Sequence, residues 1–292
     1  MSTRQDYDVA IVGAGHNGLA AACYLAAEGR RVVVIESAHK VGGMASSGYL
    51  LPEAPQHLVH PCALDLMSLR VHPMMPIELQ LDRHGFRQIE MDPGYVYLHP
   101  DGQSLVFGRS AEQTAAEIRR FSERDAAEFL DLMKLVNTFI DLAIPMMRVD
   151  PSQRNLGAKW EALKVLLRNR HLKPDLMGLI GSPAYTSIME RFEHPVTQSA
   201  LCCLLGAAGP ITGEATGVYF ALLGFIQRFG LGRAAGGMQT LSDALAARLA
   251  ELGGEVRLNA PVAEIVSRNG RAQGARLANG EVIAARSVVA AV

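Results

Sequence analysis

The chain has few cysteines and almost no excess of charge of either sign. Four cysteines occur in 292 residues, at positions 23, 62, 202 and 203, and none of them forms a Cys-x-x-Cys pair. This spacing predicts neither a disulfide framework nor a zinc site. Lys plus Arg number 28 against 29 Asp plus Glu, which leaves a formal net charge of -1. The balance argues against a nucleic-acid partner, or an anionic membrane, recruited by net charge.

Common signals of catalysis and of export are also missing. The chain has no G-x-S-x-G or H-E-x-x-H motif, and no Ser/His/Asp arrangement can be identified, so the catalytic residues stay unknown and we expect no metal. The first eight residues, MSTRQDYD, are polar and do not predict a signal peptide. We therefore expect a cytoplasmic protein and leave peripheral contact with a membrane open.

One long apolar stretch allows two interpretations. Residues 199–227 contain a single charge, Glu214, and the stretch is long enough to cross a membrane. It also contains five glycines and a proline, which a membrane helix would rarely combine with a central acid. We favour two buried helices joined at GPITGE over a transmembrane helix.

The start of the chain predicts a βαβ unit. Residues 8–12, DVAIV, have the composition of a buried strand, residues 16–28 that of an alanine-rich helix, and residues 31–36 that of a second strand. Strands joined by a helix and short connections are parallel to each other.

The rest of the chain predicts a helical region between two α/β segments. Residues 45–78 look irregular, and a β-hairpin follows, turning at Pro100-Asp101-Gly102. Residues 110–230 are mostly helical, starting with a capping box at Ser110 and Gln113. A helix from 239 then precedes strands that turn at Asn269-Gly270 and Asn279-Gly280.

We accordingly place one domain in two segments, 1–70 and 236–292, with a substrate or cap domain at 71–235 inserted between them. The last residues, SVVAAV, read as an apolar strand that nothing covers. We therefore expect the C-terminal part of the fold to come from a further segment or from a second chain.

Three glycines stand where the first predicted strand meets the helix. Gly13, Gly15 and Gly18 form G-x-G-x-x-G, which allows a tight turn, a close approach by a pyrophosphate, and close packing of helix on strand. The helix N-terminus adds free N–H groups for phosphate oxygens. Glu36 ends the second strand, where a carboxylate accepts hydrogen bonds from ribose hydroxyls.

A second glycine pair distinguishes between dinucleotides. Gly42-Gly43 follows Glu36 closely and brings more main chain against the pyrophosphate. Flavoproteins of the glutathione-reductase type have this pair, and NAD dehydrogenases generally do not. We therefore expect noncovalent FAD as the cofactor.

The stretch GAGHNGLAAACYLAAEGRRVVVIESAHKVGGMA resembles the phytoene desaturase and carotene isomerase-like flavoproteins, and looks nearest to the branch of the pyridine nucleotide-disulfide oxidoreductase domain-containing proteins. The resemblance resumes at PDGQSLVFGRSAEQTAAEIRRF and from GGMQTLSDALA to the last residue, about half the chain in all. It implies an α/β, Rossmann-like FAD-binding domain of glutathione-reductase type into which a largely helical substrate domain is inserted.

The resemblance also assigns cofactor contacts. Around the pyrophosphate it places Gly13, Gly15, Asn17, Gly18, Gly42, Gly43 and Met44. It places Glu36 and Ser37 at the adenosine ribose, and it pairs the main chain of Val262 with the adenine. Many carotene desaturases carry an arginine where this chain has Met44, which weakens the case for a carotenoid specifically.

The resemblance implies an FAD-dependent oxidoreductase that desaturates, oxidises or isomerises a hydrophobic, carotenoid- or isoprenoid-like substrate by hydride transfer to the flavin. A flavin-dependent amine oxidase and a non-catalytic FAD-binding partner or scaffold stay open as alternatives. A disulfide reductase is disfavoured because no cysteine pair follows Gly43.

Four residues are candidates for contact with substrate. His57 and His60 follow the glycine pair, where this architecture brings the chain beneath the flavin, although both could be ordinary loop histidines. Met238 and Gln239 open a helix where relatives place cavity-lining residues, and an ordinary helix start is the alternative.

Overall fold

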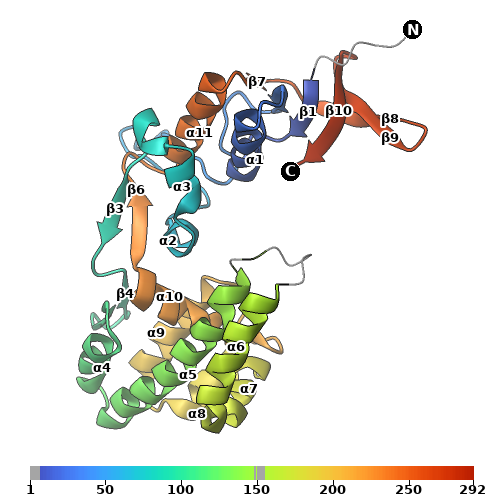
Figure 1. The fold of residues 1–292 in the computed structure, drawn as a ribbon. Helices are drawn as coiled ribbons and strands as arrows, with labels where there is room; N and C mark the ends of the chain where they lie inside the picture. Colours follow the sequence, from blue (N-terminus) through green and yellow to red (C-terminus); the bar gives the residue numbers. More distant parts are fainter. Residues whose placement is uncertain (1–6, 148, 150–154) are drawn as a thin grey trace. The chain divides into compact units, whose positions relative to one another are not determined.

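The computed structural model describes residues 7–147, 149 and 155–292, and the chain divides into two compact units (Figure 1). Unit 1 consists of Met1–Ile89 and Gly232–Val292, and unit 2 of Glu90–Leu231. The polar segment 1–6, in which we expected no signal peptide, lies outside the described residues.

The division falls at different points from the boundaries that we placed after residues 70 and 235. Residues 71–89 belong with unit 1, because Leu79, Leu81 and Phe86 are buried in its hydrophobic core. These residues contact strands and helices distant in sequence, so their own local pattern could not assign them.

Unit 1 begins with the predicted βαβ arrangement. Strand β1 (Tyr7–Val12) leads into helix α1 (His16–Ala27), and strand β2 (Val32–Ile35) returns beside β1. The two strands pair in parallel, with Val9 opposite Val32, so this prediction is confirmed.

A six-stranded sheet forms the centre of unit 1, in the order β7-β2-β1-β10-β9-β8. The added strands are β7 (Glu255–Arg257), β8 (Val262–Arg268), β9 (Arg271–Leu277) and β10 (Val282–Ala290). Asn269 and Gly270 both have positive φ, at 52° and 72°, in the turn that the sequence predicted between β8 and β9.

Strand β10 is longer than the sequence predicted. The segment SVVAAV, expected as a strand of its own, is the second half of a longer strand that pairs antiparallel with β9 over Val282–Ala284 and parallel with β1 from Ala285 to Ala290. Within SVVAAV the expectation of an uncovered apolar strand is confirmed, because pairing with β9 ends at Ala284, β1 is the partner on one side, and Val289 and Ala290 are exposed.

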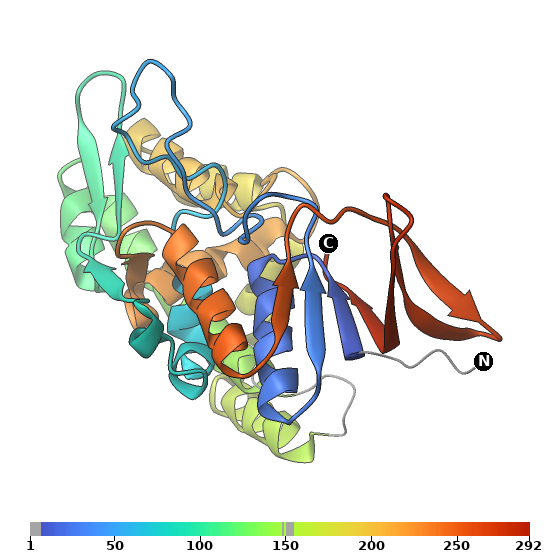
Figure 2. The ribbon, with the colours of Figure 1, turned by 90° about the horizontal axis from the view of Figure 1, so that it is seen from above.

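Both faces of the parallel strands are covered. Val9 and Ile11 of β1 pack in one hydrophobic cluster with Leu19 of α1 and Leu245 of α11 (Gln239–Glu251). On the opposite face, Ala10 belongs to a second cluster with residues of β9 and β10. Figure 2 shows α1 and α11 side by side along the strands.

The stretch expected to be irregular contains short regular elements. Helices α2 (Met67–Val71) and α3 (Met74–Glu78) and the 3-10 helix η1 (Leu81–His84) precede strand β3 (Gln88–Met91). Strand β3 forms a two-stranded sheet with β6 (Leu231–Ala234). The sequence predicted neither strand, since each is short and its partner is distant in the chain.

Unit 2 opens with the predicted hairpin of β4 (Tyr95–Leu98) and β5 (Ser104–Phe107), which pair antiparallel. Helix α4 (Ala111–Arg119) begins with the predicted capping box, in which Ser110 and Gln113 bond each other's main chain. Helix α5 (Glu123–Met147) is the longest described helix and contacts α4, α6, α7 and α10.

The remaining described helices of unit 2 lie in the region that the sequence predicted to be mostly helical. They are α6 (Leu156–Arg168), η2 (Arg170–Leu172), α7 (Lys173–Gly181), α8 (Ala184–Arg191), α9 (Pro195–Gly206), η3 (Thr216–Phe220) and α10 (Ala221–Phe229). None of the helices in the described part of the chain combines the length and apolar composition that a membrane crossing requires.

The glycines of the apolar stretch have packing roles. A β-carbon on residue 224 of α10 would stand 2.8 Å from Ile140 Cγ1 and 2.9 Å from Val136 Cγ1 on α5. A β-carbon on residue 217 would clash with the carbonyl oxygen of Leu179. The stretch thus forms separate buried helices, and Glu214 lies exposed in the turn between them.

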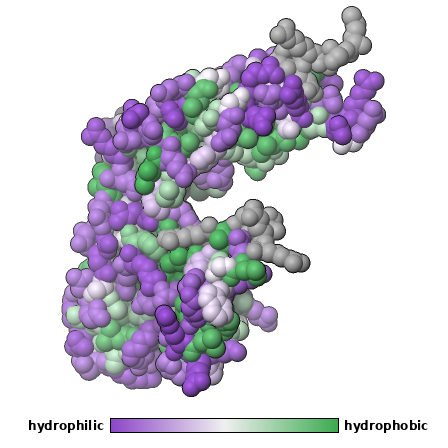
Figure 3. Space-filling model, viewed as in Figure 1, coloured by the Kyte–Doolittle hydropathy of each residue, from purple (hydrophilic) through white to green (hydrophobic). Residues whose placement is uncertain are grey.

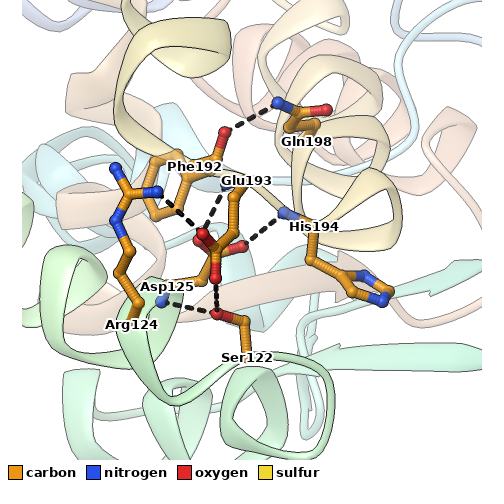
Figure 4. Close-up of polar contacts among 7 residues, drawn as sticks. All are labelled: Ser122, Arg124, Asp125, Phe192, Glu193, His194 and Gln198. Atoms are coloured by element: carbon orange, nitrogen blue, oxygen red, sulfur yellow. Dashed lines mark hydrogen bonds and ion pairs between the residues drawn. The ribbon is translucent and has the colours of Figure 1, made fainter.

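A buried carboxylate ties the connection between α8 and α9 to the start of α5 (Figure 4). Asp125 is fully buried and accepts hydrogen bonds from the main-chain N–H groups of Glu193 and His194, at 2.9 and 3.0 Å. The side chain of Glu193 meanwhile pairs with Arg124 and Ser122 at the surface. Asp125 is therefore the buried acceptor for two main-chain donors of this turn.

Candidate functional site

The three glycines after β1 have three different structural roles. Gly13 has a φ of 103°, and a β-carbon there would stand 2.6 Å from the carbonyl oxygen of Ala291. Gly18 packs so closely that its β-carbon would stand 2.2 Å from the carbonyl oxygen of Gly13. A β-carbon on Gly15, by contrast, would meet no described atom within 4 Å. Gly13 and Gly18 thus form the turn, while Gly15 leaves an open space in front of it.

The second glycine pair lies directly against the first motif. The N–H of Gly42 donates to the carbonyl oxygen of Ala14 at 2.9 Å, and the main chains of Gly15 and Gly42 form a parallel bridge. Gly42 and Gly43 have φ values of 128° and 54°, which favour glycine. Main chain from two separate loops therefore borders one space.

The N-terminus of α1 opens onto the same space. The helix begins after Gly15, which provides no side-chain cap, and its first turn contains no acidic residue. Its first N–H groups are therefore available to an anion, and the helix dipole favours negative charge there.

Glu36 lies at the end of β2, facing this turn. Its carboxylate accepts hydrogen bonds from the N–H groups of Ala14, at 2.7 Å, and Ala38, at 2.9 Å, and from the hydroxyl of Ser37 at 3.1 Å. Partial burial acts to raise the pKa of Glu36, but these three donors outweigh it and hold the pKa below its ordinary value. The group is an anion at neutral pH.

Main-chain hydrogen bonds connect the segment before Val262, the predicted adenine contact, to the segment that follows β2. The N–H of Ala260 donates to the carbonyl oxygen of Glu36 at 2.8 Å, and that of Asn259 to Ala38 at 2.9 Å. Val262 follows two residues later, at the start of β8, opposite Leu277. The structure thus brings the Glu36–Ser37 segment and the segment before Val262 side by side.

A cavity of about 580 Å³ gathers most of the predicted cofactor residues. Its lining includes Gly13, Gly15, Asn17, Glu36, Gly43 and Met44. It also includes residues that the sequence analysis did not identify, namely His16, Ala21 and the segment 289–292. The signal for that segment was available: ligand sites of parallel sheets lie at the carboxyl ends of the strands, and β10 ends there beside β1.

Two of the four substrate candidates meet at a residue that the sequence analysis missed. Ser47 is buried, and its hydroxyl lies 2.8 Å from Nδ1 of His60 and accepts the N–H of Gln239 at 3.2 Å. The side chain of Gln239 donates to the carbonyl oxygen of Val41, beside the glycine pair. Its Oε1 atom is buried and has no hydrogen-bond partner among the described residues.

The other two candidates lie elsewhere in unit 1. His57 is exposed in the loop between Gly48 and Val59, where its N–H donates to the carbonyl oxygen of Ala54. Met238 is buried in the hydrophobic cluster of α1 and α11. The structure therefore brings His60 and Gln239 together and separates them from the exposed imidazole of His57.

The donor set fits FAD. The space before Gly15, the uncapped helix and the glycine pair suit a pyrophosphate, and the anionic Glu36 suits a ribose diol while repelling a 2′-phosphate. Among the described residues, no group of three His, Cys, Asp or Glu side chains is arranged to hold a metal ion.

A model of the family described as flavin containing amine oxidoreductase matches residues 18–292. Over 98% of the chain, the sequence is 28% identical to pyridine nucleotide-disulfide oxidoreductase domain-containing protein 2 of Mus musculus, of which it covers 53%. Over 96% of the chain it is 29% identical to a neurosporene-forming phytoene desaturase of Rhodobacter capsulatus, of which it covers 51%. The chain thus spans about half the length of the curated relatives it matches.

Among solved structures, the cyclohexylamine oxidase of Brevibacterium oxydans IH-35A matches with a TM-score of 0.60 and 19% identity. The match covers 98% of this chain and 58% of the oxidase chain. At this identity the likeness concerns the fold, and it confirms the predicted α/β architecture of an FAD-binding domain with helices.

Proposed function

The chain belongs to the flavin containing amine oxidoreductase family, and from that premise we propose that it is the cofactor-binding part of an FAD-dependent oxidoreductase acting on a hydrophobic substrate. The proposal rests above all on one observation, the bridge between the main chains of Gly15 and Gly42. The bridge holds two glycine turns side by side, so that both can contact the pyrophosphate of one dinucleotide. This arrangement suits FAD.

Each residue of the site has a part in the proposal. The N–H groups at the start of α1 and the main chain of Gly43 would hold the pyrophosphate, with Asn17 and Met44 at its side. Glu36, positioned by Ser37, would bind the ribose diol, and Val262 would meet the adenine. When bound, the flavin supplies the redox chemistry by accepting a hydride, and the protein contributes binding, orientation and electrostatics.

We further propose that unit 1 is the FAD-binding domain and that unit 2 contributes to substrate binding. His60 is the best placed of the substrate candidates, because Ser47 bonds its ring, which lies against Gly237 just before helix α11. His57, Met238 and Gln239 stay predictions. Since the relatives are about twice as long as this chain, the proposed catalytic assembly includes a further segment or a second chain.

The names of the relatives support an apolar substrate. They include phytoene desaturases and a 4,4'-diapolycopene oxygenase from Methylomonas sp. Their substrates are long hydrocarbons, which offer few polar groups to a site and can be oxidised without a strong acid or base. An isoprenoid-like hydrocarbon is therefore the substrate class we propose.

A flavin spectrum of the purified protein tests the cofactor, followed by extraction and mass measurement. FAD released without proteolysis is the expected result; NAD, or no flavin after reconstitution, would overturn the assignment. Anaerobic addition of carotenoid and terpene hydrocarbons then tests the reaction, because reduction bleaches the flavin. Bleaching by primary amines alone would identify an amine oxidase, and no bleaching by either class would indicate an FAD-binding partner without catalysis.

A further inference from the structure

The first turn of helix α11 lies against the loop that contains the glycine pair. We call residues 41–47 the glycine-pair loop. No helix or strand of the described chain includes these residues, so their main-chain groups need hydrogen-bond partners from elsewhere in unit 1. Gln239 and Ser242 stand three residues apart in α11, which places their side chains on the same face of the helix.

Three hydrogen bonds join α11 to the glycine-pair loop. The Nε2 atom of Gln239 donates to the carbonyl oxygen of Val41 at 3.0 Å. The hydroxyl of Ser242 donates to the carbonyl oxygen of Ala45 at 2.9 Å. The main-chain N–H of Gln239 donates to the hydroxyl of Ser47 at 3.2 Å. The helix therefore holds the loop both before and after the two glycines.

The side-chain amide of Gln239 has one orientation in this contact. Its nitrogen also donates to Oδ1 of Asp243 at 2.9 Å, so two acceptors face the same atom. The oxygen of the amide lies beside Gly42, where a β-carbon would stand 3.4 Å from Oε1. The amide of Gln239 thus lies between α11 and the glycine pair.

These bonds are shielded from water. Ser242 is 0% exposed, and Val41 and Ala45 are buried in the same hydrophobic cluster as Leu245 of α11. A buried carbonyl oxygen that loses its donor keeps the cost of leaving water. Loss of either side-chain donor therefore favours a movement of the loop away from the helix.

The position of the loop decides the shape of the proposed pyrophosphate site. The N–H of Gly42 bonds the carbonyl oxygen of Ala14, and Gly43 borders the cavity of about 580 Å³. Gln239 and Ser242 are not among the residues that line this cavity. They can affect a ligand there only through the loop.

We propose that Gln239 and Ser242 are positioning residues, which hold the glycine-pair loop in the shape that binds the pyrophosphate of FAD. This proposal rests on the FAD site proposed above, and it is separate from the predicted contact of Gln239 with substrate. The measured affinity of a site falls with the fraction of molecules in which the site is formed. Weakening the contact with α11 should therefore weaken the binding of every ligand that has a pyrophosphate.

Titration of the 292-residue protein with FAD, ADP and adenosine tests the proposal. Adenosine keeps the ribose diol expected at Glu36 but lacks the pyrophosphate. Gln239→Glu places an oxygen opposite two acceptors and should lower the affinity for FAD and ADP about 10-fold or more. Ser242→Ala removes one hydrogen bond and should lower it about 5-fold. The affinity for adenosine should stay within about twofold of the wild type in both variants.

Two matched controls remove similar hydrogen bonds elsewhere. Thr240→Val removes a hydroxyl from the same turn of α11, but that hydroxyl donates to Ala235 and Gly237 and not to the glycine-pair loop. Gln198→Glu removes an amide donor to the carbonyl oxygen of Phe192 in unit 2. Both variants should bind the three ligands as the wild type does.

Hydrogen exchange of the apoprotein reads the position of the loop without any ligand. The N–H groups of Gly42 and Ala45 should exchange faster in Gln239→Glu than in the wild type, while those of β1 and β2 should be unchanged. Because coupling between two sites is reciprocal, FAD should in turn slow exchange in the first turn of α11.

The proposal fails if Gln239→Glu and Ser242→Ala bind ADP as tightly as the wild type. It also fails if they lose affinity for adenosine as strongly as for ADP, since this would indicate a general loss of structure. Either result would leave the FAD assignment intact. A wild-type protein that binds neither FAD nor ADP would instead refute the proposed function, and this proposal with it.

Discussion

A β-carbon on Gly43 would stand 3.3 Å from the Cα atom of Gly15, so two loops that are separated by helix α1 and strand β2 lie directly against each other. The first loop belongs to any dinucleotide-binding βαβ unit, and the second extends the same surface. This contact explains why the glycine pair predicts FAD more specifically than the first three glycines do.

The different surroundings of the glycines lead to opposite expectations for Gly15→Ala and Gly18→Ala. Gly15 has φ of -66° and ψ of 167°, which alanine adopts readily, and its methyl group would enter the open space. We expect unchanged thermal stability of the apoprotein and FAD affinity lowered by about 10-fold or more, since displacing one charged hydrogen bond costs about 1.5–3 kcal/mol. Fluorescence titration and a melting curve measure the two effects.

Gly18→Ala is the counterpart. Its methyl group would clash with the carbonyl oxygen of Gly13, so we expect about 1–3 kcal/mol of destabilisation from overpacking. If Gly18→Ala proved as stable as the wild type while Gly15→Ala unfolded, the roles assigned to the two glycines would be reversed.

Glu36→Ala should lower FAD affinity by about 10- to 150-fold, because charge-assisted hydrogen bonds to the ribose diol contribute about 1.5–3 kcal/mol. Glu36→Gln keeps the shape of the side chain and should lie between the wild type and Glu36→Ala. Titration of the apoprotein with FAD measures all three. Equal affinities would mean that the carboxylate serves only the N–H groups of Ala14 and Ala38.

The lowered pKa of Glu36 predicts the direction of a pH effect on stability. A carboxyl group whose pKa is lower in the folded than in the unfolded protein stabilises the fold at pH values above its unfolded pKa, which is 4.5 for Glu36. This stabilisation is lost as the pH falls through the pKa of Glu36 in the folded protein. The melting temperature of the wild type should therefore exceed that of Glu36→Gln at pH 7, and the difference should shrink below pH 4.5. A difference that grows in acid would contradict the assignment.

Asp125→Ala should destabilise unit 2 by about 1–3 kcal/mol, because it removes the shared acceptor of the N–H groups of Glu193 and His194. Urea denaturation followed by circular dichroism measures the change. Glu193→Gln is the matched control: its ion pair with Arg124 is exposed, and such pairs contribute about 0–1 kcal/mol. Equal effects of the two variants would show that the buried carboxylate is not the main support of this turn.

The four thiols should differ in reactivity. Burial raises the pKa of the Cys23 thiol to about 11, and its Sγ atom donates to the carbonyl oxygen of Leu245. Cys62 and Cys203 are exposed. We expect iodoacetamide at pH 8 to label these two first and Cys23 only after unfolding, as measured by peptide mass. Rapid labelling of native Cys23 would mean that α1 separates readily from α11.

The sequence predicted those parts of the molecule that depend on neighbouring residues. The βαβ unit, the capping box at Ser110 and the turn at Asn269-Gly270 each follow from a few adjacent side chains, and each is present. The cofactor residues proposed around Gly15 could be named from the sequence for the same reason, since the motif is local.

The parts that the sequence did not predict depend on distant contacts. Ser47 meets His60 and Gln239 only because helix α11 begins beside the loop after the glycine pair. The position of β10 inside the sheet likewise depends on β1, which lies at the other end of the described chain. Neither relationship leaves a periodic signal in the residues concerned.

The pairing of Ser287 with Val9 also determines the order in which the molecule can assemble during translation. A ribosome adds roughly 5–20 residues per second, so one edge of β1 has no partner strand for tens of seconds, until β10 has been synthesised. Residues 90–231 form one uninterrupted stretch and can fold in that interval from contacts near in sequence. Nascent unit 1 therefore exposes an unpaired edge of β1 until β10 has been synthesised, and a chaperone that shields strand edges would act in this period.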